Sequence, residues 1–245
     1  MGHSPDAEPG DWARGLCPVT RSRAAARQTY DRSSCWSRLE EPFERRAQAT
    51  GLELLRVQPG ERVLDLGCGS GRALVALARA VGSAGRVVGI DLSPGMIRRA
   101  TARLRRAGLA ERVELVVADA SAIPFAGTSF DAVFMSFALE LFDTPEIPLV
   151  LAECRRVLRP GGRMGVVSLS RAAPVRWPTR LYERLHDRFP ATLDCRPIHG
   201  RLALEAAGFE QAKSKLLPIW GLRAETVVAV RPTVAPPILG EEASR

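Results

Sequence analysis

Residues 62–71 read RVLDLGCGSG and are the most informative stretch of the chain. The first half is a short apolar run, typical of a buried strand, and three glycines follow at alternate positions. Glycine permits a sharp backbone turn and lets a ligand approach more closely than a side chain would allow. Residues 73–81 then show helical spacing of apolar residues, and Gly82 is a stop signal. The stretch therefore predicts a strand, a glycine loop that can bind a ligand, and a helix.

The rest of the chain continues this alternation of apolar runs and helical patterns. Ser93, followed by Pro94, is a typical helix cap, and the helix that it opens is expected to run to about Ala107. Strands that alternate with helices of this length indicate βαβ units and a parallel sheet. The remaining expected strands are 86–91, 113–119, 130–137, 163–170, 209–217 and 222–231, and the remaining expected helices are 38–56, 145–158, 177–189 and 200–207.

These elements predict an α/β fold, Rossmann-like and doubly wound, with helices on both faces of a seven-stranded, mostly parallel sheet. The last two strands are expected to form an antiparallel hairpin at the edge of that sheet. Pro160, Gly161 and Gly162 are a turn signal, so we expect them to precede the fifth strand.

The ends of the chain differ in pattern from its middle. Residues 1–28 mix proline, glycine, alanine and charged residues without periodicity, so we expect a disordered leader. Residues 232–245 contain three prolines and are expected to be a frayed tail. Between them we expect one domain over residues 29–231, with its core in residues 60–170.

The composition is that of a globular protein, with 46% hydrophobic and 25% charged residues among 245. No apolar run approaches the ~20 residues of a membrane-spanning helix. The net charge is +8, and residues 151–245 carry 16 basic and 9 acidic side chains. Such a surface can attract nucleic acid or anionic lipid, so a peripheral membrane contact is compatible with it. All but two of the 35 basic residues are arginine, a bias that weakens the case for nucleic acid.

The five cysteines are odd in number and never spaced as CxxC. This pattern indicates neither a disulfide framework nor a zinc site, and we expect no metal. A reducing compartment fits best, and the N-terminus has no apolar stretch of signal-peptide length. We therefore expect a cytoplasmic protein. The sequence does not indicate an oligomeric state.

The ligand at the glycine loop is expected to contain adenosine. Asp91 ends the second strand, where a carboxylate can accept hydrogen bonds from both ribose hydroxyl groups. A dinucleotide fingerprint would place its last glycine where this chain has Arg72, and the phosphate-binding GxxxxGK[ST] loop is absent. Asp65 lies within the first strand, where it can help to hold an ammonium group. These features favour S-adenosylmethionine, which has an ammonium group and no phosphate.

Five motifs in this order resemble the class I S-adenosylmethionine-dependent methyltransferases: VLDLGCGSG, GIDLSPGM, ADASAIPF, FDAVFMSF and LRPGGR. The likeness covers roughly residues 60–170. Within that superfamily, the chain is most similar to the ubiquinone/menaquinone-biosynthesis C-methyltransferase-like group (methyltransferase type 11). TYDRSS, over 29–34, and DCRPI, over 194–198, extend the likeness.

The resemblance implies S-adenosyl-L-methionine as cofactor and S-adenosyl-L-homocysteine as product. Asp91 would hold the ribose, Asp119 would accept from the adenine amine, and Asp65 would face the ammonium group. Ser136 and Phe137 would lie beside the transferred methyl group. The implied cofactor-binding residues are Asp65, Gly67, Gly69, Ser70, Asp91, Leu92, Met96, Asp119, Ala120 and Ser136.

The acceptor is expected to be a small molecule, quinone-like or aromatic, methylated by in-line displacement. Candidates for a general base are Tyr30, Glu140 and His199. If Glu140 has no such role, it is expected to be an exposed helix residue. Five aromatic residues can line an apolar acceptor site: Trp36, Phe137, Phe142, Trp177 and Trp220.

One departure from the quinone enzymes concerns the acceptor. The stretch SFALELF follows the fourth strand, where those enzymes usually have an arginine-asparagine pair. Two alternatives therefore stay open: an RNA or protein methyltransferase, and a non-catalytic protein that binds S-adenosylmethionine. The first is not favoured, because the chain lacks [DN]PP[FY] and a Pro-Cys nucleophile.

Overall fold

The computed structural model describes residues 10–19, 37–171, 177–188, 195–219 and 221–233. Its strands are β1 (Arg62–Leu66), β2 (Arg86–Asp91), β3 (Val113–Val117), β4 (Phe130–Ser136), β5 (Leu158–Leu169), β6 (Glu210–Ile219) and β7 (Leu222–Val230). Its α-helices are α2 (Ser37–Leu55), α3 (Arg72–Ala80), α4 (Pro94–Arg106), α5 (Ile147–Val157), α6 (Trp177–Arg188) and α7 (Gly200–Ala206). Short 3₁₀ turns cover Asp11–Ala13, Ala110–Arg112, Leu139–Leu141 and Thr144–Glu146.

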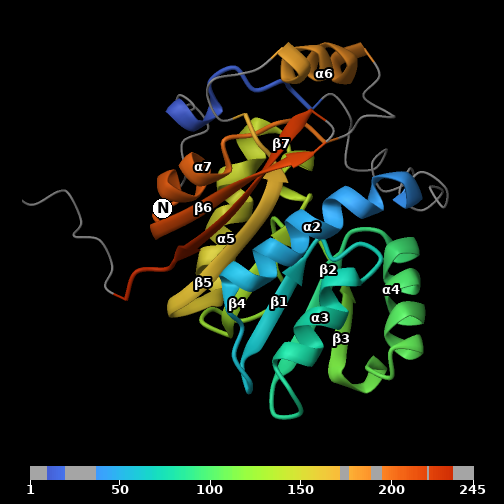
Figure 1. Ribbon diagram of the computed structural model, residues 1–245. Helices are drawn as coiled ribbons and strands as arrows, with labels where there is room; N and C mark the ends of the chain where they lie inside the picture. The colour runs from blue at the N-terminus through green and yellow to red at the C-terminus, as the bar shows by residue number, and fades with distance from the viewer. Residues whose placement is uncertain (1–9, 20–36, 172–176, 189–194, 220, 234–245) are drawn as a thin grey trace, which may run out of the picture.

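The strands form one seven-stranded sheet in the order β3-β2-β1-β4-β5-β7-β6 (Figure 1). Strands β1 to β5 are parallel, and β7 runs antiparallel to both β5 and β6. The predicted fold class, including the edge hairpin, is confirmed. The strand order reverses between β1 and β4, and doubly wound sheets bind ligands at the carboxyl ends of the strands at such a point.

Two hydrophobic layers cover the sheet, one on each face. Successive side chains of a strand point to opposite faces. In β1, accordingly, Leu64 belongs to the layer under α5 and α7, and Val63 belongs to the layer under α2, α3 and α4. Both side chains are fully buried. The continuous apolar runs of the sequence thus become strands buried on both sides.

The start of β5 differs from the expectation. The strand begins at Leu158, so Pro160, Gly161 and Gly162 lie inside it rather than before it. The pairing of β5 with β4 is irregular here, and Gly161 has a φ of 76°. The N–H of Gly161 donates to the carbonyl oxygen of Arg231 at 2.9 Å, so the segment continues the pairing with the chain that follows β7. The turn signal therefore corresponds to a bulge within β5, where Leu158 pairs with Phe130 and the next paired residue, Arg163, pairs with Ala132.

Part of the expected leader is folded. Trp12 is 8% exposed and packs in the layer that α5 and α7 cover. The N–H of Val19 donates to the Asp143 carboxylate at 3.1 Å. Within the expected leader, residues 10–19 thus contact the rest of the fold, and residues 1–9 and 20–28 lie outside the described residues. Among the described residues, no helix is long and apolar enough to cross a membrane.

Candidate active site

The loop after β1 is held in left-handed backbone conformations. Gly67, Gly69 and Gly71 have φ values of 70°, 51° and 78°, a region that other residues rarely adopt. The N–H groups of Gly67 and Cys68 both donate to the carbonyl oxygen of Ile90, at 2.8 and 2.9 Å. These two bonds tie the glycine loop to the end of β2.

The same glycines make room on both sides of the loop. A Cβ at Gly71 would lie 2.9 Å from the Cβ of Ala100, so only glycine permits this approach of the loop to α4. A Cβ at Gly69 would meet no atom within 4 Å. The backbone at Gly69 therefore borders open space, where a ligand can approach it.

Asp91, at the end of β2, connects the loop to α4. Its Oδ2 accepts from the N–H of Gly69 at 2.8 Å, and its Oδ1 accepts from the N–H of Ser93 at 2.8 Å. Ser93 in turn caps α4, because its Oγ accepts from the N–H of Met96 at 3.1 Å. A carboxylate has about four lone-pair positions, so these two bonds are compatible with further bonds to ribose hydroxyl groups.

Asp65 is the most perturbed acid of the site. Its side chain is 1% exposed, and its Oδ2 has no hydrogen-bond partner among the described residues. Burial, and then the charge of Asp91, raise the pKa of Asp65 to about 8. A buried acceptor of this kind is typical of a site completed by a ligand. An ammonium group would satisfy the oxygen and remove the repulsion, so the residues present fit S-adenosylmethionine.

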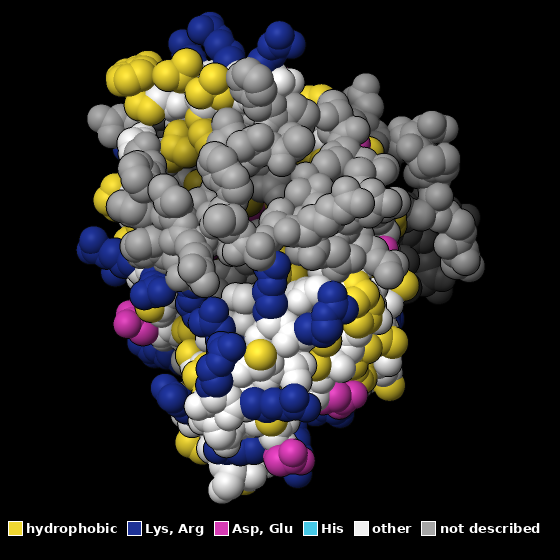
Figure 2. All heavy atoms as spheres, turned by 90° about the vertical axis from the view of Figure 1, so that its right-hand side faces the viewer, with side chains coloured by type: hydrophobic (Ala, Val, Ile, Leu, Met, Phe, Trp, Pro, Cys, Tyr) yellow, Lys and Arg dark blue, Asp and Glu magenta, His cyan; other side chains and the backbone are white. Residues whose placement is uncertain are grey.

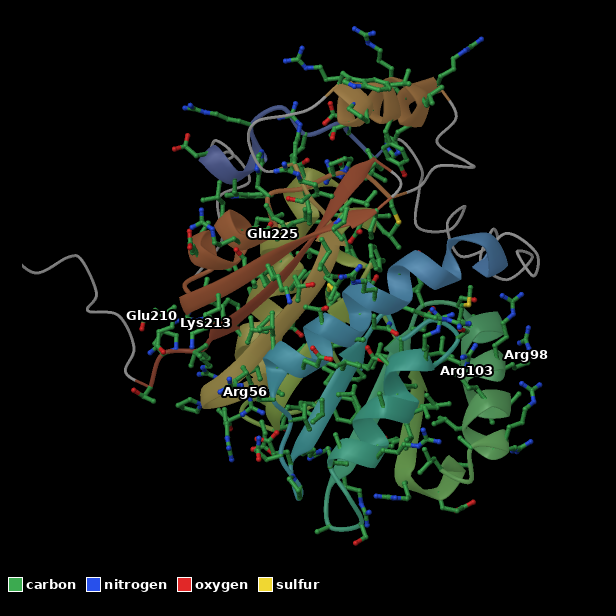
Figure 3. The ribbon with its side chains drawn as sticks, in the orientation of Figure 1. Arg56, Arg98, Arg103, Glu210, Lys213 and Glu225 are labelled. Atoms are coloured by element: carbon green, nitrogen blue, oxygen red, sulfur yellow. The ribbon has the colours of Figure 1, made fainter. Side chains whose placement is uncertain are left out.

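Three further predicted residues lie around the same loop. Leu92 and Met96 are half-buried at the start of α4, where they can pack against an adenine ring. Ser70 is half-buried in the loop, and its Oγ accepts from the guanidinium of Arg103 at 3.4 Å. Arg103 extends from α4, as Figure 3 shows.

Asp119 follows β3 and shapes a tight turn. Its Oδ1 accepts from both the N–H and the Oγ of Ser121, each at 2.8 Å. Asp119 is half-buried, and Ala120 beside it is 9% exposed. The structure therefore gives Asp119 a local turn role, which does not conflict with a bond to an adenine amine.

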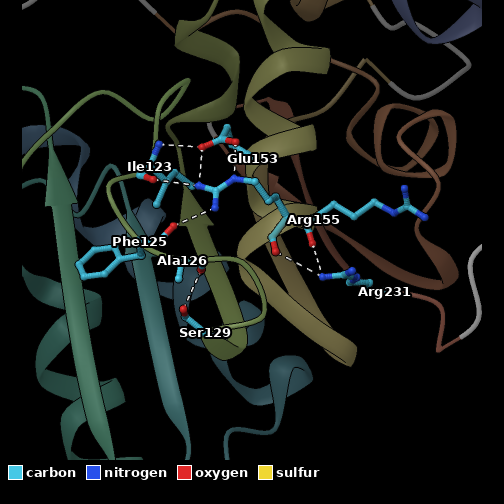
Figure 4. A network of polar contacts seen from close by, with 8 residues as sticks. Ile123, Phe125, Ala126, Ser129, Glu153, Arg155 and Arg231 are labelled. Atoms are coloured by element: carbon cyan, nitrogen blue, oxygen red, sulfur yellow. Dashed lines mark hydrogen bonds and ion pairs between the residues drawn. The ribbon is translucent and has the colours of Figure 1, made fainter. Parts of the chain in front are cut away.

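A polar network on α5 holds the loop that contains Asp119 (Figure 4). The guanidinium of Arg156 donates to the carbonyl oxygens of Ile123 and Phe125, at 2.9 and 2.8 Å. Glu153 accepts from Arg156 at 2.6 Å and from the N–H of Ile123 at 2.8 Å. The loop after β3 is thus fixed from the far side, by residues that the sequence did not single out.

Backbone strain marks the end of β4. Phe137 has a φ of 52°, which is uncommon for a bulky residue and is found most often at functional sites. Its N–H donates to the carbonyl oxygen of Val167 at 2.7 Å. The neighbouring Ser136 accepts from the side-chain amide of Gln48 at 3.3 Å. Gln48 comes from α2, 88 residues earlier, and no local pattern identified it.

The three candidate bases have different surroundings. Tyr30 lies outside the described residues. Glu140 is fully buried, which corrects the expectation of an exposed position, and it accepts from the N–H of Leu169 at 3.1 Å. His199 is half-buried beyond the carboxyl end of β5. Burial, and then the charge of Arg171, lower the pKa of His199, so its imidazole is neutral at pH 7.

A buried arginine braces the segment after β4. Arg196 is fully buried and donates to the carbonyl oxygen of Phe142 at 2.7 Å and to the Oγ1 of Thr144 at 2.9 Å. It also donates to the carbonyl oxygen of Cys17. Arg196 thereby joins three distant segments at the carboxyl end of the sheet. The only signal in the sequence was the DCRPI motif, because arginine is rarely buried.

The aromatic residues do not gather as expected. The side chain of Trp177 is 74% exposed and lies on the outside of the molecule, so it does not line an apolar site in this structure. Phe142 and Phe137 are half-buried and pack against opposite hydrophobic layers. Trp36 and Trp220 lie outside the described residues. Phe137 alone combines a position next to Ser136 with a strained backbone.

The described residues bring the cofactor candidates to one edge of the sheet, at the ends of β1, β2, β3 and β4. No group of three or more His, Cys, Asp or Glu residues in this part of the chain is arranged to hold a metal ion. The site offers carboxylates, the accessible backbone of the glycine loop and apolar side chains. This set suits an adenosine ligand with a positively charged end.

Comparisons with known proteins identify similar chains. Residues 63–162 match the family model described as "Methyltransferase domain". The chain is 40% identical over 114 residues to a "2-phytyl-1,4-naphtoquinone methyltransferase" of Synechococcus elongatus, which covers 46% of this chain and 48% of the relative. It is 37% identical over 116 residues to a "Demethylmenaquinone methyltransferase" of Lactobacillus johnsonii, with 47% of each chain covered. The matched region thus spans about half the length of these curated relatives.

A solved structure extends the likeness beyond the matched region. The S-adenosylmethionine-dependent methyltransferase SibL, crystallised in its apo form, superposes with a TM-score of 0.61 and 30% identity. The superposition covers 80% of this chain and 56% of that one. The resemblance inferred from the five motifs is confirmed.

Proposed function

We propose that this chain, whose residues 63–162 match the family model described as "Methyltransferase domain", binds S-adenosylmethionine at the carboxyl edge of its sheet and methylates a small, quinone-like or aromatic acceptor. The observation that carries the proposal is the buried Asp65 carboxyl. It precedes the glycine loop, is close enough to Asp91 for that charge to raise its pKa, and has an unpartnered oxygen that a cationic group could satisfy. The names of the relatives support the quinone-like acceptor.

Each cofactor residue has a role in this proposal. Asp65 binds the ammonium group, Asp91 binds the ribose, and Asp119 accepts from the adenine amine. Gly67, Gly69 and Ser70 surround the methionine end, and Leu92, Met96 and Ala120 contact the adenine. Ser136 and Phe137 border the methyl group. The bound cofactor supplies a methyl group already activated on a sulfonium sulfur. The chain therefore has to align the acceptor and exclude water, and alignment alone can contribute several kcal/mol.

A general base is needed only where the acceptor loses a proton. Of the two described candidates, His199 is neutral and half-buried, so it can accept a proton at pH 7. Glu140 already accepts a backbone hydrogen bond, which suits a positioning role for the segment after β4. Tyr30 remains a prediction. We also propose a cytoplasmic location. The RNA, protein and non-catalytic alternatives are not favoured by the relatives.

The decisive experiment is calorimetric titration of the full chain with S-adenosylmethionine and with S-adenosylhomocysteine. We expect Asp91→Ala to weaken binding at least about a hundredfold, because it removes charged hydrogen bonds to the ribose. The matched control is Asp131→Ala at the opposite edge of the sheet, where the carboxylate binds Arg159 and the N–H of Arg62. Thermal melts of both variants separate lost binding from lost folding.

Two results would refute the assignment. In the first, Asp91→Ala binds S-adenosylmethionine as tightly as the wild type does. In the second, the wild type binds a nicotinamide dinucleotide instead of S-adenosylmethionine. A binding-competent chain would next be incubated with labelled S-adenosylmethionine and a panel of reduced quinones. Labelled product from quinones, and none from RNA or protein, would support the acceptor class.

A further inference from the structure

Helix α6 displays an apolar row to the outside of the molecule. Trp177, Leu181 and Leu185 recur every four residues, which places them in one row along the helix. Their exposed fractions are 74%, 46% and 40%. The other large exposed hydrophobic residues of the described chain are Val117, Leu149 and Leu216, which belong to three separate elements. Among the residues that the structure describes, only those of α6 form a continuous strip of this kind.

An arginine row runs beside the apolar row. Arg180, Arg184 and Arg188 have the same four-residue spacing and are exposed. Figure 3 shows nitrogen-tipped side chains that extend from α6 away from the rest of the molecule. In Figure 2, hydrophobic and basic side chains lie together at the top of the molecule, where α6 lies, without an acidic side chain among them.

The polar side chains on the other side of α6 anchor it to the domain. The Glu183 carboxylate binds Arg171 at 2.7 Å, and the Tyr182 hydroxyl donates to the carbonyl oxygen of Cys195 at 2.8 Å. Asp187 accepts a hydrogen bond from the Cys17 thiol. Both acidic residues of the helix are thus engaged with the domain. The outer face therefore carries the apolar row and the arginine row, and the exposed Asp187 lies at the border of the arginine row.

Helix α6 lies at the same end of the strands as the candidate active site, the carboxyl end. Arg171, which binds α6, follows the carboxyl end of β5 by two residues. Its N–H donates to the carbonyl oxygen of Ile198 at 2.9 Å, and Ile198 donates to Leu169 at the last position of β5. Figure 1 shows α6 beyond the carboxyl end of β5 and the neighbouring start of β7.

We propose that the outer face of α6 binds the surface of an anionic lipid bilayer. Helices that lie in a membrane interface combine tryptophan and leucine with basic residues, whose long side chains reach the lipid phosphates while the apolar row enters the acyl boundary. Each arginine near such a surface strengthens binding by electrostatic attraction. A second copy of this chain fits less well, because a twofold interface would place three arginines against three arginines.

Docking through α6 would bring the carboxyl edge of the sheet to the lipid surface. This consequence rests on the proposed function, because a lipid-soluble quinone is available only there. The binding of lipid itself does not depend on methyl transfer. The two proposals can therefore fail separately.

The test is co-sedimentation of the full chain with vesicles, in the absence of cofactor. The vesicles are phosphatidylcholine alone or phosphatidylcholine mixed with phosphatidylglycerol. We expect binding to the anionic vesicles only, weakened by salt. Arg180→Gln with Arg184→Gln should weaken it roughly twentyfold. The matched pair is Arg98→Gln with Arg105→Gln, which removes two exposed arginines from α4. We expect less than a twofold change for that pair.

The apolar row is tested with a second matched pair. Leu181 is 46% exposed on α6 and Leu149 is 47% exposed on α5, so Leu181→Ser and Leu149→Ser remove similar apolar surface. Only Leu181→Ser should weaken vesicle binding, by roughly fivefold. The emission of Trp177, obtained as the difference between wild type and Trp177→Phe, should shift to the blue on anionic vesicles.

Three results would overturn the proposal: no binding of the wild type to anionic vesicles, equal losses from the α4 and α6 arginine pairs, or a dimer that Leu181→Ser dissociates. Calorimetric binding of S-adenosylmethionine without vesicles gives the independent readout. A chain that binds vesicles but not the cofactor would refute the proposed function and leave the α6 proposal intact.

Discussion

At the amino ends of the strands, acidic side chains meet arginines, whereas at the carboxyl ends one acid faces another. Glu61 binds Arg163 at 2.6 Å, and Asp131 binds Arg159 at 2.5 Å. The buried Asp65 instead has Asp91 as its charged neighbour, and its Oδ2 has no described hydrogen-bond partner. One sheet thus carries paired charges at the amino ends of its strands, whereas at the carboxyl ends burial and the charge of Asp91 oppose the ionisation of Asp65.

The contrast indicates what each edge is for. A paired, hydrogen-bonded carboxylate lowers the free energy of the folded state, and removal of Glu61 leaves the partly buried Arg163 without its partner. A buried carboxylate beside another carboxylate raises that free energy until a cation binds. Proteins tolerate such local instability where a ligand relieves it. We therefore infer that the side chains at the amino ends of the strands (the amino edge) stabilise the fold and that those at the carboxyl ends (the carboxyl edge) bind the ligand. Four measurements can test this division.

The largest expected effect is on the pH dependence of stability. The pKa of Asp65 is raised to about 8 in the folded chain, against 3.8 as its usual value. Between these values the folded state keeps a proton that the unfolded state has released, so stability falls as pH rises. The contribution of Asp65 should fall by up to about 5 kcal/mol between roughly pH 4 and pH 8. Urea unfolding of wild type and Asp65→Asn at several pH values measures it.

Asp65→Asn should be more stable than the wild type, and the difference in their free energies of unfolding should grow with pH. Parallel stability curves for the two proteins would contradict the unpaired state of Asp65.

At the amino ends of the strands, the pH dependence of stability should have the opposite sign. Hydrogen bonds and the charge of Arg163 outweigh burial and lower the pKa of Glu61. Its stabilisation is therefore present above its usual pKa and is lost as pH falls through the lowered value.

The second prediction concerns the binding of the cofactor at Asp65. An ammonium group needs the ionised carboxylate, so S-adenosylmethionine should displace about one proton per site at pH 7. Calorimetry in buffers of different ionisation enthalpy measures that number. Asp65→Asn should release no proton and bind about a hundredfold more weakly. Unchanged affinity, or the same proton release in the variant, would remove Asp65 from the ammonium site.

The third prediction applies the same chemical change to the amino edge. Glu61→Gln should destabilise the chain at pH 7 by about 2 kcal/mol, because Arg163 loses its partner while partly buried. Affinity for S-adenosylmethionine should stay within about twofold of wild type. Denaturant unfolding and calorimetry on the same preparation give both numbers. A loss of cofactor affinity without a loss of stability would show that the two edges are not independent.

Much of this division could be predicted from the sequence, and the reasons are local. The ends of β1 and β2 follow from short apolar runs that stop at glycine or aspartate, and Asp65 and Asp91 are placed by those ends. The Ser93-Pro94 pair alone was enough to predict that Ser93 caps α4. The acids at the carboxyl ends could therefore be placed without long-range contacts, whereas the Glu61–Arg163 pair at the amino ends, 102 residues apart, could not.

The rest depends on contacts that no local pattern encodes. Gln48 reaches Ser136 across 88 residues, and Arg196 joins Cys17 to the segment after β4. Trp12 was hidden in a stretch whose composition suggested disorder. Glu140 was expected to be exposed because charged residues usually are. In each case tertiary packing overrode the preference of the residue type.

The smallest expected effect concerns the polar network that holds the loop after β3. Glu153 binds Arg156 and the N–H of Ile123, and this network holds the loop that contains Asp119 (Figure 4). The Glu153–Arg156 pair is partly exposed, so Glu153→Gln should lower stability by less than about 1 kcal/mol. Because Asp119 would bind the adenine, affinity for S-adenosylmethionine should fall by about threefold, whereas binding of methionine should not change. If the variant weakened both ligands equally, the loop would not act through the adenine, and Asp119 would have only its turn role.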